Sequence, residues 1–287
     1  MHLMLVVTLS DLNYVPGVKA LVSSLRAHQG KVDLALIIIE KNQEVSSIFP
    51  DALRIVKNPI LPFDEHKLIL TAKSPTRSPA GNTLLWSRLF LSDYFDTFDR
   101  ILLLDADIIA INSLDKIYNH DMEGCPVAGF VDIGMFSKIK GHIPSLEGDP
   151  LGEEKAMNAG VMLIDIKKWK SEVMLQGLHV IKEGKHIWKK RDQSIINYVL
   201  KGNFSPLNPD FIRFARRSET IHPNNLLIHF TGPKPWITKG RIIKDEPARN
   251  PAFYEQKWRE EKFNIWKNSQ TLWEGYYKDF GKKTNNE

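Results

Sequence analysis

Short runs of apolar residues alternate with segments of helical spacing along most of the chain. Apolar, β-branched runs predict buried strands at His2–Thr8, Leu34–Glu40, Leu53–Val56, Arg100–Leu104, Val127–Val131 and Asn158–Ile166. Apolar positions every three or four residues predict helices at Val18–His28 and Leu84–Phe98, with further helix signals at Lys167–Val173 and from Arg191 onward. This alternation predicts an α/β fold with a mostly parallel central sheet.

Polar stretches and a change in composition mark the remaining organisation. Ser74–Asn82 and Ser137–Glu154 are rich in polar residues, proline and glycine, which predicts loops, the second of them a flexible lid. The composition changes after Trp236, where basic and aromatic residues become frequent. We therefore predict a catalytic domain over residues 1–236 and a small C-terminal extension over residues 237–287.

The composition restricts the class of protein. The chain has 287 residues, of which 43% are hydrophobic and 25% charged, as in globular proteins. Cys125 is the single cysteine, which excludes an intramolecular disulfide and a cysteine-rich zinc site. The longest aliphatic run, Leu34–Ile39, is too short to cross a bilayer, and Met1–Val7 lacks the features of a signal peptide. We expect a cytoplasmic protein.

Positive charge is concentrated near the C-terminus. The net charge is +5, and residues 233–287 contain 12 basic and 8 acidic residues together with 10 of the 28 aromatic residues. No dense basic stripe points to nucleic acid, so we expect no nucleic-acid partner. Two interpretations of the extension stay open. It packs on the domain, or it makes peripheral contact with an anionic membrane, on the inner face.

Asp105-Ala106-Asp107 directly follows an apolar strand. Ligands of open α/β sheets bind beyond the carboxyl ends of the strands. Two carboxylates this close are unfavourable unless a cation neutralises them, and oxygen ligands of this kind suit Mg²⁺ or Mn²⁺. The alternative is a turn with exposed acidic residues or a helix cap.

A second segment, His229-Phe230-Thr231-Gly232-Pro233-Lys234-Pro235-Trp236, follows the apolar run Leu226–Ile228. A histidine at a strand end is a potential metal ligand, and a lysine nearby can contact a phosphate. The alternative for His229 is a hydrogen-bonded core residue.

Taken in order, these and other motifs resemble glycosyltransferase family 8. The matches span residues 3–236 and comprise the first strand with Asn13-Tyr14, the helix with Arg88, Leu104–Asp107, Asp132, Met157–Val161, Asp192-Gln193 and His229–Trp236. The resemblance implies a single α/β domain of the GT-A type that binds a nucleotide sugar. It implies a retaining hexosyltransferase with a UDP-sugar donor, UDP-glucose or UDP-galactose, and a glycan or lipid-linked acceptor resembling lipopolysaccharide.

The resemblance also implies roles for individual residues. Asp105, Asp107 and His229 would hold Mn²⁺, with Mg²⁺ as the second choice. The donor would be bound by Thr8, Leu9, Ser10, Asn13, Tyr14, Ala106, Gly232 and Lys234. Arg88 would contact the sugar or the diphosphate, and the transferred sugar would be surrounded by Asp132, Asn158, Asp192 and Gln193. In one respect the sequence departs from the family pattern, because a single residue, Pro233, separates Gly232 from Lys234.

Retention of configuration requires a covalent intermediate or attack from the same face of the sugar. Asp192 or Gln193 is the candidate nucleophile in the first case, and the sequence leaves both routes open. Two other functions are weighed against transfer. A sugar-phosphate nucleotidyltransferase is disfavoured because the loop after the first strand lacks a glycine-rich basic run, and an inactive UDP-sugar-binding protein is disfavoured because every expected position is filled.

Overall fold

The computed structural model describes residues 4–29, 32–40, 44–62, 84–183, 188–215, 221–232, 234–236 and 260–280. The chain divides into two compact units. The first contains Met1–Leu12, Asp33–Asp105 and Ile117–Asn208, and the second contains Asn13–Val32, Ala106–Lys116 and Pro209–Glu287. The boundary that we predict after residue 236 borders residues 237–259, which lie outside the described residues, and it stays a prediction.

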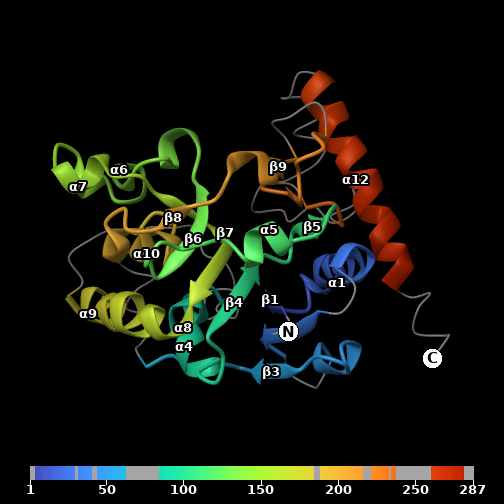
Figure 1. Cartoon of the computed structure of the whole chain (residues 1–287), viewed down its shortest axis with the longest axis horizontal. Coiled ribbons are helices and arrows are strands. Elements are labelled where there is room, and N and C mark those ends of the chain that lie inside the picture. The colour runs from blue at the N-terminus through green and yellow to red at the C-terminus, as the bar shows by residue number, and fades with distance from the viewer. Residues whose placement is uncertain are drawn as a thin grey trace. The chain divides into compact units, whose positions relative to one another are not determined.

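The first unit is built on a seven-stranded sheet of order β3-β2-β1-β4-β7-β6-β8 (Figure 1). Its strands are β1 (Leu5–Ser10), β2 (Asp33–Ile38), β3 (Arg54–Lys57), β4 (Arg100–Leu104), β6 (Val127–Val131), β7 (Met157–Asp165) and β8 (Ser205–Pro206). β7 pairs antiparallel with both of its neighbours, and the other pairs are parallel. The predicted mostly parallel sheet is therefore confirmed.

The strands form where the sequence places uninterrupted apolar runs. All six residues of β1 are buried, and so are Ile101–Leu104 in β4. A parallel strand covered on both faces has no solvated side, so its residues do not alternate between apolar and polar. The predicted bounds of β4 and β6 match the structure, and the other predicted strands are displaced by a few residues at most.

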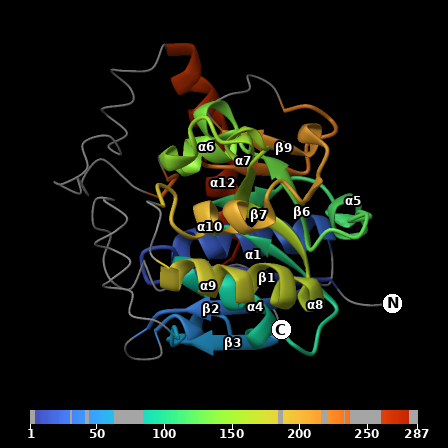
Figure 2. The same ribbon diagram turned by 90° about the vertical axis from the view of Figure 1, so that its left-hand side faces the viewer.

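The helical elements of the first unit are mostly short. They are η1 (Ser46–Ile48), η2 (Arg88–Phe90), α4 (Leu91–Tyr94), η3 (Gly134–Phe136), α6 (Ile139–His142), η4 (Pro144–Leu146), α7 (Pro150–Glu153), α8 (Ile166–Lys168), the π-helical turn η5 (Trp169–Met174), α9 (Leu175–Glu183) and α10 (Asp192–Leu200). In Figures 1 and 2, α4, α8, α9 and α10 lie on one face of the sheet.

Two sequence predictions differ in part from the structure. The predicted helix at Leu84–Phe98 is helical over 84–94, as an α-helical turn at 84–87 followed by η2 and α4, and it ends at Tyr94, before the predicted end. The predicted lid at Ser137–Glu154 contains α6, η4 and α7. It is tied down by backbone hydrogen bonds such as Ile139 N–H to the Glu154 carbonyl, at 3.0 Å. The predicted loop at Ser74–Asn82 lies outside the described residues.

The second unit combines a small sheet with two longer helices. The sheet has the order β5 (Ile108–Ala110), β10 (Leu227–His229), β9 (Ile212–Phe214), and η6 (Pro209–Phe211) precedes β9. The helices α1 (Val15–Gln29) and α12 (Glu260–Phe280) pack against one another (Figure 1). α1 begins three residues before the predicted start, with Pro16 in its first turn, where a missing N–H has no consequence. α5 (Asp115–Tyr118) lies where the chain returns to the first unit.

A glycine allows the start of α1 to approach the turn after β4. A Cβ atom on Gly17 would lie 2.2 Å from the carbonyl oxygen of Ala106 and 2.7 Å from the ring of Trp236. Both distances are far shorter than normal contacts, so any other residue would push the helix away. Gly17 therefore sets how closely α1 approaches Ala106.

Aromatic side chains of α12 pack within the second unit. Trp273 is buried and belongs to a cluster with Ala20, Ile109 and Phe230. The hydroxyl of Tyr276 lies 2.6 Å from Nε2 of His28 on α1. For these two residues the packing interpretation of the extension is confirmed. None of the helices in the described part of the chain is both long enough and apolar enough to traverse a bilayer.

We expect Gly17→Ala to lower the free energy of unfolding by about 1–3 kcal/mol, because overpacking forces backbone shifts. Urea denaturation measures this difference. Gly275→Ala is the matched control, since a Cβ at Gly275, also in a helix, meets nothing within 4 Å. That control should gain up to about 1 kcal/mol from helix propensity. Equal stability of Gly17→Ala and wild type would contradict the steric argument.

Candidate active site

Arg88 is bound between two acidic residues in the first unit. Asp105 directly follows β4, and its N–H donates to the Gly160 carbonyl at 2.8 Å. The buried guanidinium of Arg88, from η2, contacts the Asp105 carboxylate and lies 3.2 Å from Oδ2 of Asp192. It also donates to the carbonyl of Ala159 at 3.3 Å. The structure therefore joins three residues that are far apart in the sequence, all of them predicted site residues or their neighbours.

Asp192 begins α10 and is almost completely buried, with 3% exposure. Burial raises the pKa of its carboxyl to about 6, although the charge of Arg88 acts in the opposite direction. The residue before it, Arg191, has φ 52° and ψ −120°, which is unfavourable for a residue with a side chain. Strained backbone of this kind is found at functional sites. Here it directs the chain into α10 so that Asp192 meets Arg88.

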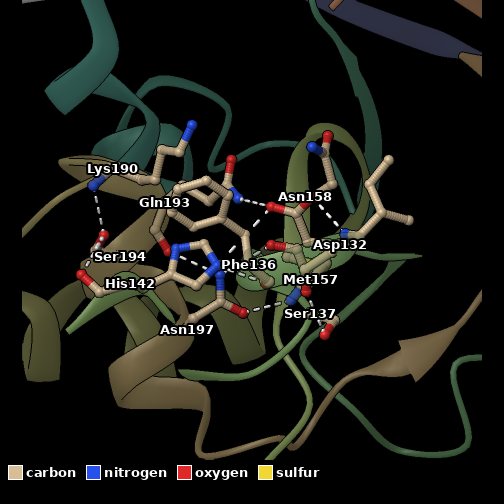
Figure 3. Close-up of polar contacts among 12 residues, drawn as sticks. Asp132, Phe136, Ser137, His142, Met157, Asn158, Lys190, Gln193, Ser194 and Asn197 are labelled. Atoms are coloured by element: carbon tan, nitrogen blue, oxygen red, sulfur yellow. Dashed lines mark hydrogen bonds and ion pairs between the residues drawn. The ribbon is translucent and has the colours of Figure 1, made fainter. Parts of the chain in front are cut away.

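Asp132 and Gln193 form a direct pair, and their side chains point toward one another in Figure 3. Nε2 of Gln193 donates to Oδ2 of Asp132 at 2.6 Å, while Oδ1 of Asp132 accepts from the N–H of Ile133 at 2.8 Å. A carboxylate only accepts hydrogen bonds, so this contact fixes the orientation of the Gln193 amide. Its carbonyl oxygen is consequently turned away from Asp132.

Asn158, labelled in Figure 3, lies in β7. Its Oδ1 accepts from the N–H of Gly160 at 3.0 Å. Within the described residues its side-chain NH₂ group makes no hydrogen bond. Asn158, Asp132, Asp192 and Gln193 therefore belong to one described unit, as does Arg88. All five are predicted site residues.

Sequence analysis did not single out two buried polar residues that support this group. The side chain of Asn197 on α10 makes two hydrogen bonds to the backbone of Met157 (Figure 3). Its Oδ1 accepts from the Met157 N–H at 2.6 Å, and its Nδ2 donates to the Met157 carbonyl at 2.8 Å. His142 lies with Nε2 3.0 Å from the Phe136 carbonyl and 3.8 Å from Oδ2 of Asp132. A polar residue within the apolar run of α10 was a usable signal for Asn197, whereas nothing in the sequence pattern indicates His142.

Thr8, Leu9 and Ser10 end β1 and are all buried. Ser10 donates from its hydroxyl to the Asp11 carbonyl at 2.9 Å. Within the described residues, the Thr8 hydroxyl has no hydrogen-bond partner. These three positions lie at the carboxyl end of a central strand, as the prediction of a nucleoside pocket requires.

Asp107 is the centre of the second cluster, which lies within the second unit. Oδ1 of Asp107 is 3.2 Å from Nε2 of His229, and Oδ2 contacts the ammonium of Lys234. All three residues are largely buried, and His229 is the last residue of β10. Burial by itself would raise the pKa of Asp107, but Lys234 and His229 outweigh it and hold that pKa well below its usual range. The Asp107 carboxylate is therefore ionised at neutral pH.

The segment after β10 turns sharply and then returns to the start of α1. Gly232 has φ 97°, a conformation that favours glycine. The indole N–H of Trp236 donates to the Asn13 carbonyl at 3.0 Å, and its ring lies edge-on to Tyr14 with centroids 5.6 Å apart. Asn13 and Tyr14, two predicted donor-binding residues, therefore contact Trp236, which lies two residues after the predicted donor-binding residue Lys234.

The donor set fits a divalent cation. Asp107 provides an ionised oxygen ligand, and His229 an imidazole nitrogen beside it. Asp105 is separated from Asp107 by Ala106 alone, in the turn between β4 and β5. Asp105, Asp107 and His229 form a group that could hold a metal ion. The two carboxylates match the preference of Mn²⁺ and Mg²⁺ for oxygen ligands, and the imidazole is a ligand that suits transition metals rather than Mg²⁺.

A comparison with protein families decides the classification. The model for glycosyl transferase family 8 matches residues 5–240, which is most of the chain. The chain belongs to glycosyltransferase family 8. The resemblance stated from the motifs is thereby confirmed.

Curated relatives of this family 8 chain include plant and bacterial proteins. A probable galacturonosyltransferase-like 4 of Arabidopsis thaliana is 24% identical over 277 residues, which cover 86% of this chain and 75% of the relative. A lipopolysaccharide 1,2-glucosyltransferase of Escherichia coli K12 is 28% identical over 174 residues, covering 54% of this chain and 51% of the relative. This chain therefore spans between half and three quarters of the length of these two proteins.

Solved structures establish the fold of this family 8 chain. The galactosyltransferase LgtC, in complex with donor and acceptor sugar analogs, has a TM-score of 0.62 at 20% identity, covering 90% of this chain and all of LgtC. The glycosyltransferase GlyE of Streptococcus pneumoniae has a TM-score of 0.60 at 19% identity, covering 99% of this chain and 64% of GlyE. The predicted GT-A type of α/β fold is confirmed.

The raised pKa of Asp192 predicts how stability depends on pH. An acid whose pKa rises on folding keeps a proton that the unfolded chain has already released, so stability falls as pH rises from about 4 to about 6. The difference between the pKa of this carboxyl in the folded protein, about 6, and its ordinary pKa corresponds to about 3 kcal/mol. Relative to wild type, Asp192→Asn should therefore gain up to about 3 kcal/mol in free energy of unfolding between pH 4 and pH 7.5.

Urea denaturation at several pH values, with a chelator present, measures this difference. Asp99→Asn is the matched control, because the Asp99 side chain is 83% exposed. Its curve should run parallel to that of the wild type. A difference between Asp192→Asn and wild type that stays constant from pH 4 to pH 7.5 would contradict the burial argument.

Proposed function

We propose that the protein transfers a hexose, glucose or galactose, from a UDP-sugar to a glycan or glycolipid acceptor, with retention of anomeric configuration and with a divalent metal ion. The observation that carries this proposal is the cluster of Asp107, His229 and Lys234, which joins the Asp-x-Asp segment to the segment after β10. Lipopolysaccharide 1,2-glucosyltransferase and the galactosyltransferase LgtC are relatives that support the choice of sugars.

Asp105, Asp107 and His229 are the residues that would hold the metal, Mn²⁺ in the first place and Mg²⁺ in the second. A bound divalent ion neutralises the negative charge that develops on a departing diphosphate. Lys234 adds a cation from the protein itself, and it is already close to the Asp107 carboxylate. Gly232 lets the backbone turn there, and Tyr14, Asn13 and the end of β1 would bind the nucleoside.

Gln193 is the better placed of the two candidate nucleophiles. Asp192 is buried and bound to Arg88, whereas Gln193 is partly exposed and its amide is oriented by Asp132. The Gln193 carbonyl oxygen then faces the ligand side and carries the partial negative charge that stabilises an oxocarbenium-like sugar. Asp192 keeps Arg88 in place, and Asn158 offers its NH₂ group to a sugar hydroxyl.

A lipid-linked acceptor would suit a cytoplasmic enzyme in peripheral contact with the inner face of a membrane. The burial of Trp273 and the bond of Tyr276 to His28 remove these two side chains from any membrane surface. Tyr277, Lys267 and Lys278 on α12 are exposed and support such a contact. Sedimentation with anionic vesicles tests membrane contact separately from transfer.

The proposed reaction can be tested without knowing the acceptor, by measuring UDP release from UDP-glucose and UDP-galactose. We expect release with Mn²⁺ and loss of release with a chelator. Asp107→Asn should lower the rate at least about 100-fold, because it removes a charged ligand of the metal ion that would neutralise the leaving diphosphate. Asp99→Asn, which changes an exposed carboxylate, should retain the wild-type rate.

The outcomes separate the proposal from its alternatives. UDP binding without release, even in the presence of glycan and glycolipid acceptors, would favour an inactive binding protein. Release of pyrophosphate from UTP and a sugar phosphate would identify a nucleotidyltransferase. Absence of UDP binding would overturn the proposal altogether.

A further inference from the structure

A stack of aromatic rings joins α12 to the segment after β10 within the second unit. The ring centroids of Trp236 and Trp273 are 5.6 Å apart, with an angle of 34° between the planes. Trp273 is in turn stacked on Tyr277, at 5.2 Å and 10°. On its other side Trp236 meets Tyr14 edge-on. Trp236 is thus held between α12 and the start of α1.

Hydrogen bonds fix the same segment at two neighbouring residues. Nε2 of Gln270 on α12 donates to the Pro235 carbonyl at 3.0 Å. The indole N–H of Trp236 donates to the Asn13 carbonyl. Pro235 and Trp236 directly follow Lys234, so the backbone next to Lys234 is anchored by α12 and by the turn before α1.

The packing leaves the Trp236 ring little freedom to move. Trp273 is 3% exposed, and a Cβ on Gly17 would already lie 2.7 Å from the Trp236 ring. Loops that bind ligands depend on rigid neighbours to hold their side chains in position. Without Trp273 and Gln270, the segment that contains Gly232 and Lys234 would keep its contact with Asn13 and lose its support from α12.

We infer that α12 belongs to the donor-binding machinery, and that Trp273 and Gln270 are positioning residues that hold Lys234 and Tyr14 in place for the nucleotide. This inference rests on the proposed function, since it takes the ligand of the segment to be a nucleoside diphosphate. The C-terminal extension then contributes to donor binding, even though it begins beyond the residues that match the family motifs.

The test is the dissociation constant for UDP in the presence of Mn²⁺, measured by isothermal titration calorimetry on the full chain. Trp273→Ala should weaken UDP binding at least about tenfold, and Trp273→Phe should recover most of the loss because it keeps an aromatic ring. Gln270→Ala removes one hydrogen bond and leaves the stack intact, so binding should weaken about 2- to 10-fold.

Thr271→Ala is the matched control. Thr271 is an exposed neighbour on α12, and its hydroxyl bonds to the Lys267 carbonyl of the same helix. This variant should bind UDP as the wild type does. Stoichiometry separates positioning from folding, because partial unfolding lowers the number of binding sites and leaves the dissociation constant of the folded molecules unchanged.

If Trp273→Ala does not fold, Gln270→Ala and Trp273→Phe still decide the question. A wild-type dissociation constant in Gln270→Ala, together with a reduced number of sites in the Trp273 variants, would overturn the inference and leave the proposed function intact. Absence of UDP binding by the wild type would overturn the proposed function, and the inference with it. A weaker dissociation constant at full stoichiometry is the result that we expect.

Discussion

The organisation of the first unit around its site depends on one buried guanidinium. Arg88 holds Asp105 at the end of β4 and Asp192 at the start of α10, and removal of its charge would leave Asp192 buried without a counter-charge. The backbone near Arg88 and Asp192 departs from regular helix geometry where these ion pairs form. The chain interrupts a regular helix at η2 and accepts an unfavourable backbone conformation at Arg191, and both departures bring charged groups into contact.

The central strands were predictable because burial on both faces produces uninterrupted apolar runs, as in β1 and β4. The helical segment that begins at Leu84 was predictable from its apolar spacing. The 3-10 turn η2 within it was not, because the buried Arg88 there makes its contact with Asp192, which is distant in sequence. The ligand-type residues Asp107 and His229 stood out as polar residues at strand ends. His142 did not, because its hydrogen bond serves a backbone group of another element, and Asn197 was marked only by its place within the apolar run of α10.

Two clusters of buried charged residues differ in how their charges are compensated. The first consists of Arg88, Asp105 and Asp192, and the second of Asp107, His229 and Lys234. In the first, a single arginine serves two carboxylates, and burial still raises the pKa of Asp192 to about 6. In the second, Lys234 and His229 both face one carboxylate, and the pKa of Asp107 falls. A carboxylate whose pKa is well below neutral pH stays charged and can attract a cation. A carboxylate whose pKa is near neutral pH needs a permanent positive charge beside it to remain ionised.

Neither compact unit is a continuous stretch of chain. The second unit takes its segments from near the N-terminus, from the middle and from the C-terminal part. Its sheet cannot close until β5 and β10, more than 100 residues apart in sequence, have both been synthesised. Contacts of such long range slow folding, and they leave the early segment α1 without its partner α12 during synthesis. A cut at any position between Val32 and Pro209 therefore separates parts of the second unit from one another.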